Sequence, residues 1–208
     1  NLRDGVLRAG VKEDIKKDIA LMSAGTIAYL CTKTGDAVGT IYNKNNKMEF
    51  FPLKSDTYSI EKILAKYDKD MTMENVSDIN KTLNYIKKHI NKSMIMFIIT
   101  DLAGLESIDD IYFRELSMRH DIMIINVSDG CLFGKDVYDM DNNTYIPNIF
   151  SRNKELFDLE SDYKEQLFYT CSNKISKYRV SVVTIDSIEE IPIKIIKLLE
   201  DYKYANRH

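Results

Sequence analysis

The chain has 208 residues, of which 44% are hydrophobic and 29% charged, and its formal net charge is −3. A domain of this length buries roughly 70% of its unfolded surface, so the composition fits a globular protein and excludes disordered and fibrous classes. The slight acidic excess argues against a partner such as nucleic acid. The three widely spaced cysteines indicate reduced thiols, with neither a disulfide framework nor a zinc site.

Helical and strand patterns alternate along the chain. The first helix is expected over residues 13–31, with an inward face of Ile15, Ile19, Met22, Thr26 and Leu30. A β-hairpin follows, with strands over residues 37–42 and 47–53. The further helices are expected over residues 58–67, 77–89, 108–119, 154–177 and 188–202. The further strands are expected over residues 94–100, 121–127 and 179–185, with a small hairpin around Asn142 and Asn143.

This order predicts the α/β class, with a Rossmann-like, doubly wound and mainly parallel sheet flanked by helices. The continuous apolar run at 94–100 predicts a strand buried on both faces. Such sheets usually begin with a central strand, yet only residues 6–9 are a weak candidate for one, so we expect that strand to be missing or supplied by another segment. The long helix at 154–177 is expected to turn inward the residues Leu156, Leu159, Tyr163, Leu167, Cys171 and Ile175.

The sequence shows neither a membrane-spanning segment nor a signal peptide, which predicts a cytoplasmic protein. The longest apolar run, residues 94–99, is far shorter than the ~20 residues that a spanning helix needs. The first residues are too charged for a signal peptide.

Asp101 is the main candidate for a site residue, because ligands of such sheets bind at the carboxyl ends of the strands. It ends the most apolar strand, and Ser77 stands at the start of a helix that is expected nearby. A carboxylate and a hydroxyl are oxygen ligands that suit Mg²⁺. The alternative is that Asp101 only caps the chain after its strand, and Ser77 or Asp78 equally fits the cap of its helix.

The remaining polar candidates have simpler explanations as turns, helix caps or solvated helix faces. They are Asp129, the pair Asp109 and Asp110, the pair Lys16 and Lys17, and the run 87–89. His120 lies between a helix and a strand with no nucleophile signature beside it, so a packed or solvent-facing side chain is expected. Motifs of serine hydrolases, zinc proteases and phosphate-binding loops are absent from the sequence, which assigns no catalytic residue.

Five segments together resemble the von Willebrand factor A-like domain of the bacterial domain-of-unknown-function family 58. They are AYLCTKTGDAVGTIYN (28–43), SDINKTLNYI (77–86), IMFIITDLAG (95–104), RHDIMIINVSDG (119–130) and VYDMDNNTYI (137–146). Their order and spacing carry the resemblance, which covers residues 13–199.

The resemblance implies a single von Willebrand factor A-like domain over residues 1–208 that is N-terminally incomplete. It also implies a metal-ion-dependent adhesion site, in which Ser77 matches the position of a Thr and Asp101 matches the Asp of the third loop. The Asp-x-Ser-x-Ser loop of that site is absent, and residues 1–10 correspond to the segment just after it. A bound Mg²⁺ or Mn²⁺ would therefore have an incomplete set of ligands.

The resemblance further implies association with a MoxR-type AAA+ ATPase in the assembly or maturation of protein complexes. Contact with a membrane would come only through a segment upstream of residue 1, at its cytoplasmic side. The favoured hypothesis is a non-enzymatic protein-interaction domain whose contact with its partner depends on the metal.

Two alternatives stay open. The first is an interaction scaffold that needs no metal. The second, less favoured, is a Mg²⁺-dependent phosphoryl-transfer enzyme on a related α/β sheet, with Asp101 as a metal ligand or nucleophile. That enzyme would need a second acid and a cation, and Asp129 and Lys135 are the residues available for them.

Overall fold

The structure is a computed structural model that describes residues 2–44, 47–70, 78–128, 138–139, 144–145 and 154–205. Its helices are α1 (Leu2–Thr34), α2 (Thr57–Asp70), α3 (Ile79–His89), α4 (Leu102–Ser107), α5 (Asp110–Leu116), α6 (Lys154–Ser176) and α7 (Ile191–Ala205), with a 3₁₀ turn η1 (Ile188–Glu190). Its strands are β1 (Val38–Lys44), β2 (Lys47–Lys54), β3 (Ile95–Thr100), β4 (Asp121–Val127), β5 (Tyr138–Asp139), β6 (Thr144–Tyr145) and β7 (Ser181–Ile185). Every helix and strand expected from the sequence is present, but α1 begins eleven residues earlier than expected, and α4 is additional.

The main sheet is parallel and has the order β3-β4-β7. Strand β4 lies in the middle, and every residue of it after Asp121 is buried. Strand β3 is less buried than the continuous apolar run at 94–100 predicts, because β4 is its one hydrogen-bonded neighbour in the described part of the chain. Ile95 at its start is 49% exposed.

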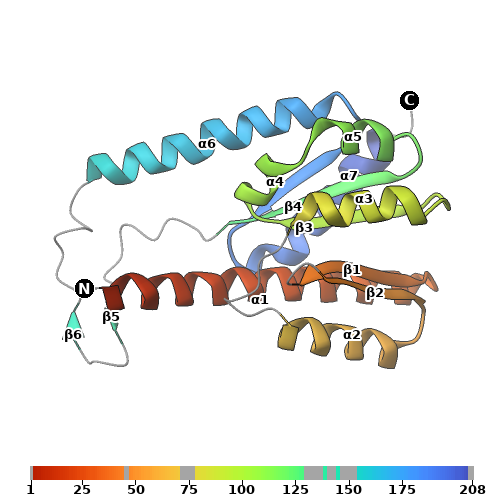
Figure 1. Ribbon diagram of the computed structural model, residues 1–208, viewed down its shortest axis with the longest axis horizontal. Helices are drawn as coiled ribbons and strands as arrows, with labels where there is room; N and C mark the ends of the chain where they lie inside the picture. Colours follow the sequence, from red (N-terminus) through yellow and green to blue (C-terminus); the bar gives the residue numbers. More distant parts are fainter. Residues whose placement is uncertain are drawn as a thin grey trace.

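Alternation along the strands divides the core into two layers, one on each face of the sheet. Side chains with even numbers in β3 and β4 pack with α3, α4, α5 and α6. Side chains with odd numbers in β4 and β7 pack with α1 and α7. The chain is therefore a mixed α/β protein whose parallel sheet is flanked by helices on both faces (Figure 1).

The hairpin of β1 and β2 is antiparallel, as expected, and forms a sheet of its own in the described residues. Helix α2 packs on the hairpin and on α1. Residues 6–9, the weak strand candidate, lie within α1. The main sheet has three strands in the described part of the chain, fewer than the doubly wound sheet expected from the sequence would have.

Helix α1 buries only part of the face that its sequence spacing suggested. Ile19, Ser23 and Ile27 are buried, whereas Met22 is 49% and Leu30 37% exposed. Spacing alone did not identify the face because α1 carries apolar residues on several sides and contacts the sheet, α2 and α7 together.

The residues of α6 that were expected to face inward are buried only in the second half of the helix. Cys171 and Ile175 are buried, but Leu159 is 64% and Tyr163 63% exposed. The first half of α6 reaches beyond the main sheet (Figure 1), so these two side chains have no part of the sheet to cover. No described helix is both long and apolar enough to cross a membrane.

The helix expected over residues 108–119 is present as the shorter α5, and α4 precedes it. Asp109 occupies the residue before α5, but its side chain makes no capping hydrogen bond, contrary to the expectation. Its backbone oxygen instead accepts a hydrogen bond from the Tyr112 amide at 3.0 Å. Asp78, in contrast, caps α3 by accepting a hydrogen bond from the Lys81 amide.

We expect Ile124→Ala to lower the free energy of unfolding by about 2–5 kcal/mol, because Ile124 is fully buried in the central strand. Ile193→Ala removes the same atoms from a side chain that is 71% exposed on α7 and should change stability by no more than about 0.5 kcal/mol. Urea denaturation of both variants checks the difference. Equal losses would show that β4 is not the centre of the core.

Candidate functional site

Asp101 lies where β3 ends and caps the first turn of α4. Its Oδ1 accepts a hydrogen bond from the Gly104 amide at 2.9 Å. This bond satisfies one of the amides that a helix leaves unpaired at its start. The capping explanation left open by the sequence is therefore correct for one of the two carboxylate oxygens.

Gly104 makes this tight turn possible. A Cβ at residue 104 would collide with Thr100 Oγ1 and would stand 3.2 Å from Asp101 Oδ1. The turn from β3 into α4 thus depends on a residue without a side chain, which brings the backbone close to the carboxylate.

The second carboxylate oxygen of Asp101 faces α1. Lys16 Nζ lies 3.4 Å from Asp101 Oδ2, and the two side chains are 30% and 40% exposed. At the next residue of α1, Lys17 Nζ lies 2.8 Å from Asp68 Oδ1 of α2. Lys16 and Lys17 are therefore ion-paired residues, and the expectation of a solvated helix face was wrong. The partners are far apart in sequence, so no local signal could have revealed these pairs.

A row of polar side chains crosses the sheet beside Asp101. Thr100, Asn126 and Thr184 are aligned in register on β3, β4 and β7. Asn126 is 4% exposed, and its Nδ2 donates to Thr184 Oγ1 at 3.2 Å. Its Oδ1 has no hydrogen-bond partner among the described residues. Sequence reasoning missed Asn126, although an amide inside an otherwise apolar strand was a visible signal.

Several predicted residues lie outside the described part of the chain. They are Ser77, Asp129 and Lys135. Asn80, in the first turn of α3, is described and bonds to the segment between α4 and α5. Its Nδ2 donates to the Ser107 oxygen at 2.8 Å, and its Oδ1 accepts from the Asp109 amide at 3.2 Å. The start of α3 is therefore held against the helix that Asp101 caps.

The described side chains around Asp101 do not provide a suitable set of ligands for a divalent cation. One carboxylate oxygen caps α4, and the other faces the Lys16 ammonium, which would repel a cation placed there. No group of three or more His, Cys, Asp and Glu side chains suited to a metal occurs within the described ranges. Among described residues, the arrangement is a charge pair at the carboxyl edge of the sheet.

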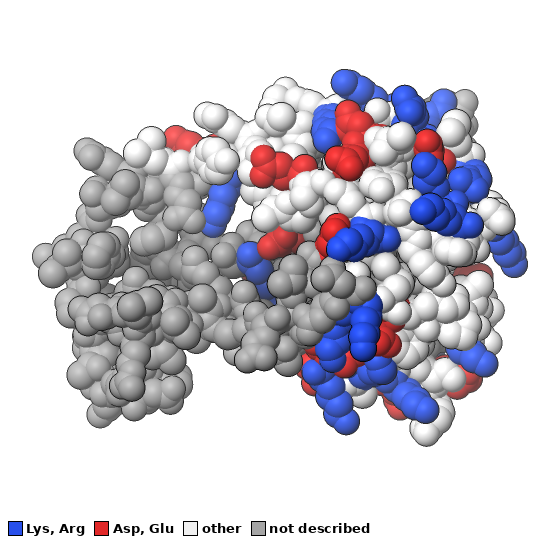
Figure 2. Space-filling view, in the orientation of Figure 1, with Lys and Arg blue, Asp and Glu red and all other residues white. Residues whose placement is uncertain are grey.

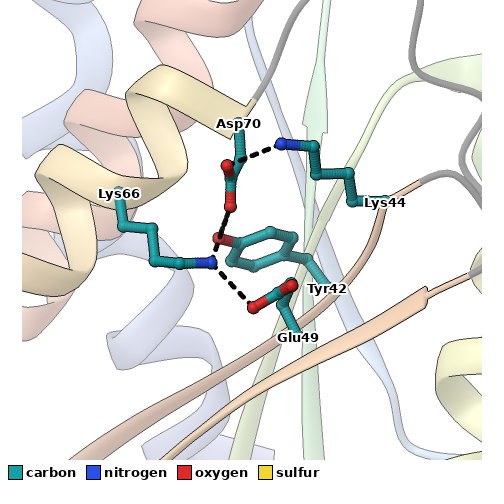
Figure 3. A network of polar contacts seen from close by, with 5 residues as sticks. All are labelled: Tyr42, Lys44, Glu49, Lys66 and Asp70. Carbon is teal, nitrogen blue, oxygen red and sulfur yellow. Dashed lines mark hydrogen bonds and ion pairs between the residues drawn. The ribbon is translucent and has the colours of Figure 1, made fainter.

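A second polar cluster holds α2 against the hairpin (Figure 3). Asp70 accepts hydrogen bonds from Tyr42 Oη at 2.8 Å, Lys44 Nζ at 2.7 Å and Lys66 Nζ at 2.9 Å. Lys66 Nζ also donates to Glu49 Oε2 at 2.7 Å. The bonds from Lys44, Lys66 and Tyr42 hold the pKa of Asp70 well below its usual range. Burial, and then the bond to Asp70, raises the pKa of Tyr42.

His120 and the described cysteines are structural. His120 is 3% exposed, and burial, followed by the adjacent charge of Arg119, holds its pKa below the ordinary value. Cys31 and Cys171 are free thiols whose pKa values are raised, mainly by burial. A raised thiol pKa disfavours the thiolate, so neither cysteine is placed as a nucleophile.

The chain is thus a mixed α/β domain. The carboxyl ends of its parallel strands carry the Lys16–Asp101 ion pair and the polar row through Asn126. The family described as "Protein of unknown function DUF58" matches residues 5–131, which is more than half of the chain. The chain therefore belongs to this family. The match includes Lys16, Asp101 and Asn126 but is shorter than the resemblance drawn over residues 13–199. No curated protein matches the chain.

We expect Asp70→Asn to destabilise the fold at neutral pH, because it removes the charge that three donors share. The pKa of Asp70 is lower in the folded chain, so its contribution is present above its unfolded pKa of about 3.9 and is lost as pH falls below it. Thermal unfolding at neutral and acidic pH should therefore show a variant deficit that shrinks in acid. Glu61→Gln, an exposed change on the same helix, is the control. A deficit independent of pH would contradict this role.

Acidification should also destabilise the chain through His120. Because the pKa of His120 is depressed in the folded state, the unfolded state binds more protons below about pH 6.5. Stability is thus complete above that pH and falls as pH is lowered. His120→Phe should reduce the loss between about pH 7.5 and about pH 5.5 in urea denaturation, whereas His89→Gln should leave it unchanged. An unchanged loss in His120→Phe would show that other groups cause it.

Proposed function

We propose that this chain is a non-enzymatic, von Willebrand factor A-like interaction domain that binds a protein partner at the carboxyl edge of its sheet. The partner that we propose is a MoxR-type AAA+ ATPase, in the assembly or maturation of a protein complex. The observation that carries the proposal is the Lys16–Asp101 pair, which stands partly exposed where β3 ends.

The chemistry of this edge supports recognition of a partner. The pair offers one cation and one anion to the outside, so a partner carboxylate can bind Lys16 and a partner Lys or Arg can bind Asp101. Asp101 is held in position by the Gly104 amide, which lowers the cost of ordering it on binding. Such preorganised, partly exposed charges favour specificity for a partner.

The sequence left open whether the partner is bound with or without a metal ion. The described geometry favours binding without one. The positive charge beside the Asp101 carboxylate is already supplied by the Lys16 ammonium, in place of Mg²⁺ or Mn²⁺. The ammonium neutralises the carboxylate and presents its own donors, so a bridging cation is unnecessary. The metal-dependent form would require Lys16 to leave.

Binding of the purified ATPase to the chain and its variants tests the proposal. We expect Asp101→Asn and Lys16→Met each to weaken the complex at least about tenfold, because each removes one of the two charges that the partner would contact. The exchanged pair, Lys16→Asp with Asp101→Lys, should restore an ion pair but not binding, and it also loses the cap of α4. Asp68→Asn is the matched control, since it breaks the neighbouring Lys17–Asp68 pair on the same helix.

A complex unaffected by both variants would overturn the proposed surface, and no complex with the wild-type chain would overturn the partner. Calorimetric titration of Mn²⁺ into the chain and into Asp101→Ala tests the metal separately. We expect no heat that depends on Asp101, and such heat would favour the metal-dependent form. Turnover of phosphate esters that is lost in Asp101→Ala would instead favour the phosphoryl-transfer alternative.

A further inference from the structure

A row of cations lies at the amino edge of the main sheet, opposite the Lys16–Asp101 pair. Each of the three parallel strands is preceded by a turn, and each turn carries a basic residue two or three positions before its strand. These residues are Lys92 before β3, Arg119 before β4 and Arg179 before β7. The three strands are neighbours in one parallel sheet, so the three turns lie at the same edge of it.

Further cations surround this line. Residues 87–92, 114–121 and 177–181 together contain seven Lys and Arg against two acids, although the whole chain has a net charge of −3. In Figure 2, blue side chains crowd the end of the molecule where α3 and α6 end. These three segments are therefore basic within a chain of net negative charge.

Most of these cations have no fixed partner. Lys87 pairs with Glu115, and Arg119 Nη1 donates weakly to Asn91 Oδ1 at 3.4 Å. No hydrogen bond or ion pair joins Lys88, Lys92 or Lys177 to any described residue. Helix dipoles favour basic residues in the last turn, as at Lys87, but Lys92 and Arg179 lie beyond the helix ends. Their charges are available to an outside partner.

Arg179 supplies an independent sign that this edge has a role beyond the fold. Its φ is 57°, in the left-handed region that favours glycine or asparagine after a helix. A residue with a Cβ carries a conformational cost there. The side chain of Arg179 is exposed at this edge.

The shape and apolar content of the edge indicate which anion it meets. The cations come from three turns at one edge of the sheet, so they can meet one surface together. Met118, beside Arg119, is 73% exposed among them. Tyr204 is 68% exposed at the end of α7, close to the same edge because Tyr202 Oη donates to Asp121 at the start of β4. Exposed apolar side chains among flexible cations are typical of proteins that bind anionic membranes.

We propose that this basic end, defined by Lys88, Lys92, Arg119, Lys177 and Arg179, binds the surface of an anionic lipid membrane. Lysines without fixed partners suit the diffuse negative field of such a surface, and Met118 can enter the headgroup layer. Bound in this way, the domain would turn its carboxyl edge, with Lys16 and Asp101, away from the membrane. The two surfaces act on different partners, so the proposed function and this inference can fail separately.

Cosedimentation with vesicles tests the inference. We expect the chain to bind vesicles of zwitterionic lipid containing about one third anionic lipid, with affinity that falls as salt rises, and not to bind purely zwitterionic ones. Lys88→Gln with Lys92→Gln should reduce the partition coefficient about fivefold for each charge, or roughly 25-fold together. Lys62→Gln with Lys69→Gln on α2 removes the same net charge from exposed positions elsewhere and is the matched control.

Met118→Ser should weaken binding further without changing its salt dependence, because it removes apolar contact and no charge. Equal binding to both kinds of vesicle, or equal loss in the control, would overturn the proposal. Binding to polyglutamate or duplex DNA with none to anionic vesicles would also overturn it and would point to an acidic protein or a nucleic acid. Circular dichroism of each variant establishes that the fold is retained.

Discussion

The structure depends on the complete burial of strand β4. Among the described strands it alone has a hydrogen-bonded neighbour on each side, and helices cover both of its faces. Its odd and even residues therefore belong to two different layers of the core, so one strand joins α1 and α7 to the helices on the other face. The parallel register of β3 and β7 on β4 then brings all three carboxyl ends to one edge and all three amino ends to the other.

This arrangement separates two kinds of chemistry. At the carboxyl edge, the turn after β3 places the Asp101 carboxylate next to the Lys16 ammonium. The polar row through Asn126 lies beside this ion pair. At the amino edge, short turns after helices carry cations, of which Lys92 and Lys177 have no partner among the described residues. Both features follow from the parallel topology. The three strands all end at the carboxyl edge, and all three begin at the amino edge. A domain of this design can contact a protein on one side and another surface on the opposite side.

The hairpin and α2 form a smaller unit attached to α1. Asp70 gathers three donors from two elements, and this cluster fixes α2 against β1 and β2. Because α1 contacts both this unit and the main sheet, the position of Lys16 relative to Asp101 depends on how α1 is held along its length. The site is thus sensitive to packing that lies far from it.

Local pattern by itself determined the order of helices and strands, the hairpin and the position of Asp101 at the end of β3, because these follow from hydrophobic period and turn residues within short windows. Tertiary structure decided the rest. Which side of α1 is buried depends on neighbours that its own spacing does not encode, so Met22 was assigned inward and is exposed. The pairing of Lys16 with Asp101 spans 85 residues, and the gathering of Lys92, Arg119 and Arg179 requires three strands to be in register. Contacts between distant segments arise only when the chain packs, which is why the sequence indicated the elements but not the two surfaces that they form.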